Sequence, residues 1–100
     1  MSETRLPAAN GTDAEWLAQV GARLAELRRS QRLTVVEVAR QTGLARRTVA
    51  LAESGGNPTL LTIVRLLRLY GRLDALTSFL PPSELSPMAL IAPPKRGRRG

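Results

Sequence analysis

Residues that begin and end helices divide this chain into short segments. Thr34 is followed three residues later by Glu37, a capping-box pattern that predicts the start of a helix. Gly43 then supplies the left-handed residue at which helices commonly end. Further boundaries are expected at Gly55-Gly56, Asn57-Pro58-Thr59, Gly71 and Pro81-Pro82. These divisions predict a compact all-α domain of five short helices joined by short turns.

Apolar residues recur at helical spacing between these boundaries. The expected helices cover residues 13–30, about 34–43, about 45–54, 59–71 and roughly 74–80, and Thr12 or Asp13 can cap the first. Its apolar face is expected to contain Trp16, Leu17, Val20, Leu24 and Leu27. Its last turn is expected to gather Arg28, Arg29 and Arg32, where cations suit the helix dipole. The fourth helix is expected to bury Leu60, Ile63, Val64, Leu67 and Tyr70.

The segments outside residues 13–80 differ in composition from the helical domain. Residues 1–12 are polar, contain Pro7 and Gly11, and are predicted to form a disordered arm. Residues 81–92 form a predicted extension that contacts a second copy or a partner, and residues 86–92 fit either a helical turn or a strand. Residues 93–100, PPKRGRRG, are predicted to be a disordered basic tail.

Composition narrows the classes of function. The 100 residues carry 15 Lys and Arg against 8 Asp and Glu, a net charge of +7, and this favours a polyanionic partner. Nucleic acid is the first such partner, an anionic membrane is the second, and a basic surface that only aids solubility is the alternative. The absence of cysteine and histidine excludes thiol, zinc and imidazole chemistry. We therefore expect a cytoplasmic protein that is not an enzyme and has no cofactor, metal, small-molecule ligand or membrane span.

The second and third expected helices have the spacing of a helix-turn-helix. Their connection is very short and centres on Gly43, and the small Ala39 lies four residues earlier, where another helix must cross closely. Val38, Val49 and Ala52 are expected to pack between the two helices. In a helix-turn-helix, the second helix enters the DNA major groove with its N-terminal end.

The third helix begins in a way that is unfavourable for an isolated helix. Arg46 and Arg47 occupy its positive end, and Ala45 stands where a capping side chain is expected, a combined deficit of about 1–2 kcal/mol. DNA phosphates and base acceptors can supply the missing negative partners, because arginine donates two hydrogen bonds to guanine or phosphate. Ala50 and Leu51 follow on the outward side, and Leu51 is a thymine-methyl contact, a partner contact or a partly buried residue. The pattern predicts a DNA-reading helix.

Residues 33–71, LTVVEVARQTGLARRTVALAESGGNPTLLTIVRLLRLYG, resemble the Cro/repressor-type (Xre) helix-turn-helix domain, and the first helix also fits. The resemblance implies a lambda-repressor-like fold and a transcriptional regulator that binds double-stranded DNA at a palindromic operator, with repression the expected activity. A homodimer is expected, since one recognition helix reads too few base pairs for useful specificity.

The resemblance also implies roles for particular residues. Base-reading positions fall on Arg46, Arg47, Ala50 and Leu51, and phosphate contacts fall on Thr34, Val35, Ala45, Asn57 and Thr59. The structural positions are Arg28, Ala39, Gly43, Val49 and Glu53, and Arg28 is expected to pair with Glu53 and so join the first helix to the third. Two departures weaken phosphate binding, because Val35 replaces the usual glutamine and Ala45 replaces the usual serine or threonine.

Residues 70–91 resemble the extension of short Xre-type proteins that accompany HipA-type kinase toxins, which implies an antitoxin that binds a toxin protein. Leu73, Leu76, Phe79 and Leu80 form an apolar stripe that is expected to mediate dimer contact, or else to cover the base of the bundle. Two other functions stay open. One is a protein-interaction module that neutralises a partner through its apolar C-terminal surface, and the other is binding to a membrane surface through residues 60–72.

Overall fold

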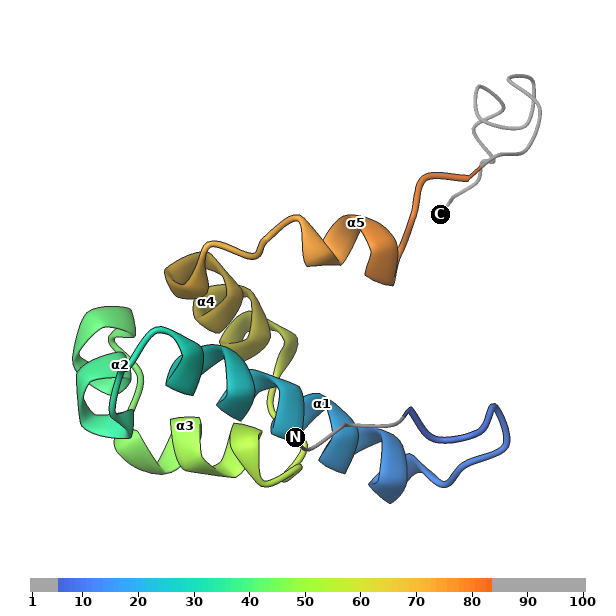
Figure 1. The fold of residues 1–100 in the computed structure, drawn as a ribbon, viewed down its shortest axis with the longest axis horizontal. Coiled ribbons are helices and arrows are strands. Elements are labelled where there is room, and N and C mark those ends of the chain that lie inside the picture. The colour runs from blue at the N-terminus through green and yellow to red at the C-terminus, as the bar shows by residue number, and fades with distance from the viewer. Residues whose placement is uncertain (1–5, 84–100) are drawn as a thin grey trace, which may run out of the picture.

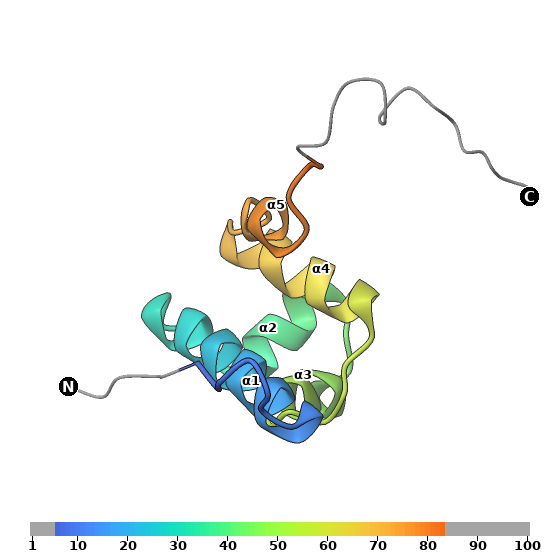
Figure 2. The same cartoon turned by 90° about the vertical axis from the view of Figure 1, so that its right-hand side faces the viewer.

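The computed structural model describes residues 6–83, and the regular secondary structure in this part of the chain is all helical, with no strand. The helices are α1 (Asp13–Ser30), α2 (Val35–Thr42), α3 (Arg46–Glu53), α4 (Leu60–Tyr70) and α5 (Ala75–Phe79). Helices α1 to α4 surround one core, and α5 follows the end of α4 on the side away from α3 (Figures 1 and 2). The expected all-α fold of five helices is confirmed.

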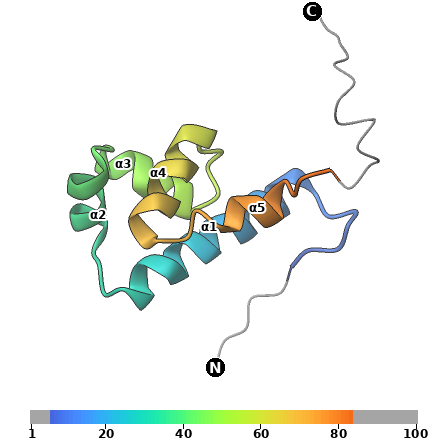
Figure 3. The same cartoon turned by 90° about the horizontal axis from the view of Figure 1, so that it is seen from above.

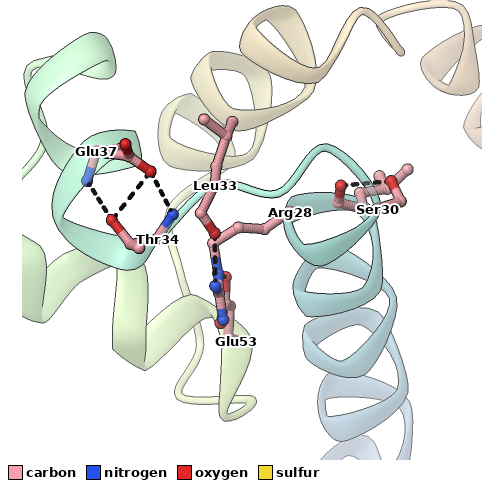
Figure 4. A network of polar contacts seen from close by, with 7 residues as sticks. Arg28, Ser30, Leu33, Thr34, Glu37 and Glu53 are labelled. Atoms are coloured by element: carbon pink, nitrogen blue, oxygen red, sulfur yellow. Dashed lines mark hydrogen bonds and ion pairs between the residues drawn. The ribbon is translucent and has the colours of Figure 1, made fainter.

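Three of the helices begin with a threonine that caps them. Thr12 and Thr34 each form a complete capping box, with Glu15 and Glu37 respectively. The Glu37 backbone N–H donates to the Thr34 hydroxyl at 3.1 Å, and the Thr34 N–H donates to the Glu37 carboxylate at 2.8 Å (Figure 4). Thr59 caps α4 by accepting a hydrogen bond from the Thr62 N–H. Thr12 rather than Asp13 is therefore the cap of α1.

The C-terminal ends of the first four helices use left-handed residues, but not the same residue type. Glycine takes this conformation after α2, α3 and α4, at Gly43, Gly55 and Gly71. After α1 the left-handed residue is Arg32, with φ of 59°, and such a conformation costs a non-glycine residue about 1–2 kcal/mol. The prediction that Arg32 belongs to the last turn of α1 is wrong, because the helix ends at Ser30.

The core is built from small and branched side chains of α1 to α4. Val38, Val49, Ala52 and Leu66 have no exposed surface, and Leu24 is 3% exposed. The expected packing of Val38 with Val49 and Ala52 is confirmed. Burial of a valine or leucine side chain stabilises the fold by about 1.5–3 kcal/mol, so these few residues supply much of the stabilising free energy.

Two predictions about buried faces are wrong. Val20 is 42% exposed, because the neighbouring Gly21 is the residue of α1 that faces α3. Leu60 is 61% exposed, because it is the first residue of α4 and lies before the stretch of this helix that packs on the core. Leu66, which the predicted face of α4 did not include, is fully buried instead.

Helix α1 and the end of α3 approach each other backbone to backbone. A Cβ atom on Gly21 would lie 2.5 Å from the Glu53 carbonyl oxygen and 2.7 Å from that of Ala52. A Cβ atom on Gly55 would lie 2.9 Å from Cα of Ala18. Both glycines are therefore required by space, and Gly55 is also required by its φ of 83°.

The apolar stripe at the end of the domain is divided by the fold. Leu73 and Leu76 are half-buried and pack against the core, whereas Phe79 is 62% and Leu80 74% exposed. In Figure 3, seen from above, α5 extends away from α2. Residues 1–5 of the expected arm, residues 84–92 of the extension and the basic tail lie outside the described residues. None of the helices in residues 6–83 is long and apolar enough to cross a membrane.

Candidate nucleic-acid interface

Helix α3 has one buried side and one exposed side. Val49 and Ala52 are completely buried. The exposed residues of this helix and its C-cap are Arg46, Arg47, Ala50, Leu51 and Ser54. The four residues expected to read bases therefore share the exposed side. Ser54 lies on the same side, eight residues after Arg46, and the helical period alone could have identified it.

The start of α3 is uncapped and carries no acidic residue. Ala45 is extended, with φ of −71° and ψ of 148°, and no side chain accepts a hydrogen bond at this end. The first hydrogen bond of the helix runs from the Val49 N–H to the Ala45 carbonyl at 3.1 Å. The N–H groups of Arg46, Arg47 and Thr48 come before that bond, so this end presents backbone donors as well as the positive end of the helix dipole.

The charges of Arg46 and Arg47 are not neutralised within the described chain. Both side chains belong to exposed residues, and within residues 6–83 neither forms a hydrogen bond or an ion pair. Two guanidinium groups and several backbone donors therefore lie together at one helix end. An anion with planar acceptors, such as a phosphate group or the edge of a guanine base, fits this set of donors.

The opposite end of α3 is held by an internal ion pair. Nε and Nη2 of Arg28 donate to the two carboxylate oxygens of Glu53, at 2.7 and 3.0 Å, and Nη1 donates to the Leu33 carbonyl at 2.9 Å (Figure 4). These side chains are only 13% and 12% exposed. The hydrogen bond to Glu53 raises the pKa of Arg28 above its usual value, although burial acts against it. The pairing that the family resemblance implied is present, and it joins α1, α3 and the connection before α2.

Leu51 is partly covered by the loop after α3, and its role as a base contact or partner contact stays a prediction. Its Cδ2 atom would lie 3.0 Å from a Cβ on Gly56, and its carbonyl accepts the Gly56 N–H at 2.8 Å. The side chain nevertheless remains 44% exposed. Leu51 is therefore supported by the loop after α3 while part of its surface stays available for contact.

The predicted phosphate-contact residues differ in what they can offer. The Thr34 hydroxyl takes part in the α2 capping box, and the Thr59 hydroxyl donates to the Thr62 hydroxyl at 3.0 Å. Val35 is half-buried, and it has only a backbone N–H to donate, as has the exposed Ala45. Asn57 is exposed, with a left-handed φ of 57°. Its side-chain amide has no hydrogen-bond partner within residues 6–83.

The carboxylate of Glu37, which caps α2, has a pKa shifted by its hydrogen bonds. Hydrogen bonds from the backbone and the side chain of Thr34 lower the pKa of Glu37. Glu37 therefore stays ionised at neutral pH, and it places a negative charge beside the N-terminus of α2. This charge makes that end less favourable for phosphate than the uncapped end of α3.

The residues expected to be structural in the helix-turn-helix determine its geometry and are not contact residues. Ala39 is 6% exposed and Val49 is completely buried. Gly43 has φ of 79°, but a Cβ atom there would meet nothing within 4 Å. Gly43 is therefore needed for its backbone conformation alone. Helix α4 buries Leu66, Leu67 and Tyr70 in the core, so these residues are not available to a membrane surface, whereas Leu60 and Leu61 are exposed.

Comparison with known families agrees with this geometry. A family model described as a helix-turn-helix domain matches residues 19–80, which is more than half of the chain. The match includes most of α1 and all of α2 to α5. A search of curated proteins finds no significant match. With α2, the turn at Gly43 and α3 all inside the matched range, the chain belongs to the helix-turn-helix family of DNA-binding domains.

Proposed function

We propose that this protein is a sequence-specific transcriptional regulator that binds double-stranded DNA and inserts α3 into the major groove. The observation that carries the proposal is the start of α3, where Arg46 and Arg47 are exposed and unpaired within residues 6–83 on an uncapped helix end. A protein that used α3 only as a structural element would gain by a cap and an acidic residue there.

The exposed residues of α3 and of the loop after it can make different kinds of contact with DNA. Arg46 and Arg47 can each donate two hydrogen bonds to O6 and N7 of guanine, or contact phosphate. Ala50 lets the helix approach the base edges without steric obstruction. The exposed part of Leu51 can contact a thymine methyl group, and the free amide of Asn57 can donate to a backbone phosphate.

Base selection by α3 is tested with an operator selected from a random duplex library. Arg46→Ala should lose preference at one base pair of that operator, a discrimination of about 1–3 kcal/mol, while keeping its binding to random duplex. Removal of residues 95–99, four of which are basic, should weaken binding to every sequence alike. Equal loss of specific and random binding in Arg46→Ala would mean that α3 does not read bases.

We also propose that the regulator is a homodimer that represses transcription from a palindromic site. The support is the exposed end of α5, where Phe79 and Leu80 present apolar surface next to the half-buried Leu73 and Leu76. Sedimentation equilibrium should give a dimer for the wild type and a monomer for a Phe79→Asp, Leu80→Asp double variant. A wild type that stays monomeric on its operator would contradict this dimer.

The same exposed surface supports a second candidate, binding to a partner protein. Phe79 and Leu80 are the most exposed large apolar residues between residues 6 and 83. The family resemblance of residues 70–91 makes a HipA-type kinase toxin the most concrete partner, so the protein would be an antitoxin that represses its own operon. A kinase-like gene next to this one, and a complex lost in the same double variant, would support this candidate. A toxin that neither binds nor is inhibited would remove it.

A further inference from the structure

Arg32 is the exception among the left-handed residues that end the first four helices. Glycine takes this conformation after α2, α3 and α4, and glycine adopts it without steric cost. The motif after α1 is otherwise the usual one, with the Arg32 N–H donating to the Arg29 carbonyl at 2.9 Å and the Leu33 N–H donating to the Arg28 carbonyl at 3.2 Å. An arginine at this position carries a steric cost that glycine would avoid, which raises the question of what its side chain can contribute.

Stabilisation of the α1 dipole does not explain this arginine. Arg28 and Arg29 already occupy the last turn of the helix, where cations are effective. Arg32 lies beyond the end of α1, its residue is exposed, and within residues 6–83 its side chain has no hydrogen-bond or ion-pair partner. The charge is therefore directed to solvent or to a ligand.

The position of Arg32 relative to α3 is set by the ion pair described above. Arg28 holds the Leu33 carbonyl and the Glu53 carboxylate at the same time, so the residue after Arg32 is connected to the end of α3 (Figure 4). Thr34 then begins the capping of α2. In helix-turn-helix domains, the first helix of the motif, which is α2 here, crosses the DNA backbone when the second, α3, lies in the major groove.

The first residues of α2 and its cap offer no free side-chain donor for a phosphate, and Arg32 can supply one. Val35 has no polar side chain, and the Thr34 hydroxyl donates to Glu37 at 3.2 Å. We infer that Arg32 donates to a DNA phosphate beside α2 and supplies there the side-chain contact that Thr34 and Val35 do not offer. This inference rests on the proposed DNA-binding function.

The test is a comparison of stability and DNA binding in Arg32→Gly. Glycine relieves the backbone strain and removes the charge, so the melting temperature should stay the same or rise while binding weakens. Affinity for a short duplex of mixed sequence, titrated between about 50 and 200 mM salt, should fall by about threefold to tenfold at the low-salt end. The slope of log affinity against log salt should become smaller by about 0.9, the loss of one phosphate contact.

Three further variants separate this contact from a general charge effect. Arg32→Lys should keep the wild-type salt slope. Asparagine tolerates the left-handed conformation, so Arg32→Asn should reduce the slope by the same amount as Arg32→Gly. Arg65→Gln is the matched control, because Arg65 is an exposed arginine of α4 that lines a shallow surface depression with Gln41 and Gly43 at the far end of α2. It removes the same charge and should change the slope far less.

The outcomes distinguish this inference from the function on which it rests. Equal slopes for Arg32→Gly and Arg65→Gln would overturn the phosphate contact while DNA binding by α3 stands, and a melting temperature that falls in Arg32→Gly would overturn the argument from backbone strain at Arg32. A wild type with no salt-dependent affinity for duplex DNA would overturn the proposed function together with the inference. A smaller slope in Arg32→Gly and Arg32→Asn alone would establish the contact.

Discussion

The two ends of α3 are built in opposite ways. At its C-terminal end, Glu53 receives two hydrogen bonds from Arg28, and Gly21 of α1 lies directly against the Glu53 and Ala52 carbonyls. At its start, Ala45 provides no cap, and the two arginines that follow have no partner within residues 6–83. One end is satisfied by the chain itself, and the other leaves donors and charge unsatisfied.

The difference shows how a poorly started helix can persist. Helix α3 has 8 residues, too few for stability in isolation. Packing of Val49 and Ala52, together with the ion pair at Glu53, stabilises it by more than the missing cap costs. The tertiary contacts at the end of the helix thus allow its start to serve an external ligand. Four experiments test this comparison.

The largest expected effect is at the close contact between α1 and α3. Gly21→Ala should destabilise the fold by about 3 kcal/mol, because its Cβ atom would meet backbone atoms at 2.5–2.8 Å that cannot move aside independently. Urea unfolding measures the change. Gly43→Ala is the control for a glycine without close neighbours, since only its backbone conformation is at issue. A Gly21→Ala protein as stable as the wild type would show that α1 and α3 are not in backbone contact.

Loss of the ion pair should have the next largest effect. Glu53→Gln leaves the guanidinium of Arg28 partly buried without a carboxylate, and this should lower the free energy of unfolding by about 2 kcal/mol. A double-mutant cycle with Arg28→Met isolates the coupling between the two side chains. A coupling energy near zero would mean that packing alone holds the end of α3.

A new cap at the start of α3 should have a smaller effect with opposite signs in two assays. Ala45→Asp should raise the free energy of unfolding by about 1 kcal/mol, since its carboxylate would accept from backbone N–H groups and complement the dipole. The same negative charge should weaken affinity for duplex DNA. Ala45→Ser tests the cap without the charge and should stabilise the fold without the same electrostatic loss. Unchanged stability in both variants would show that the start of α3 is already satisfied.

The smallest effect at ordinary pH comes from Tyr70, whose burial raises its pKa to about 12. Glu53 also raises this pKa, and Arg28 lowers it. The folded protein therefore holds the phenol proton more tightly than the unfolded chain, so Tyr70 leaves stability unchanged below about pH 10 and reduces it as the pH rises toward about 12. As the sole tyrosine, it can be followed by phenolate absorbance. A midpoint near 10 before unfolding would contradict a buried phenol.

Local signals in the chain predicted the boundaries of the helices well. The pairing of Thr34 with Glu37, and the glycines at 43 and 71, act through hydrogen bonds and dihedral angles within a few residues. The exposed positions of Arg46 and Arg47 were also predictable, because two fully buried residues of α3 define the opposite side of a single helical period. The roles assigned to these arginines remain predictions that the experiments above must test.

Errors arose where one helix meets another. Apolar character at helical spacing placed Val20 and Leu60 on buried faces, yet a glycine brings α1 against α3, and Leu60 precedes the packed part of α4. Arg32 was assigned to a helix that ends before it. The stripe at the end of the domain was treated as one surface, but the fold buries part of Leu73 and Leu76 and exposes Phe79 and Leu80.

The sequence by itself determined the number of helices, their order and the side of α3 that faces outward, because capping, glycine conformation and helical periodicity depend on neighbours in the chain. Only the tertiary structure decided which side chains remain without partners. Pairing of Arg28 with Glu53 crosses 25 positions and was expected only through the family resemblance, and Arg32, Arg46 and Arg47 are left unpaired within residues 6–83. Such pairings depend on distances between helices, and periodicity within one helix carries no information about those distances.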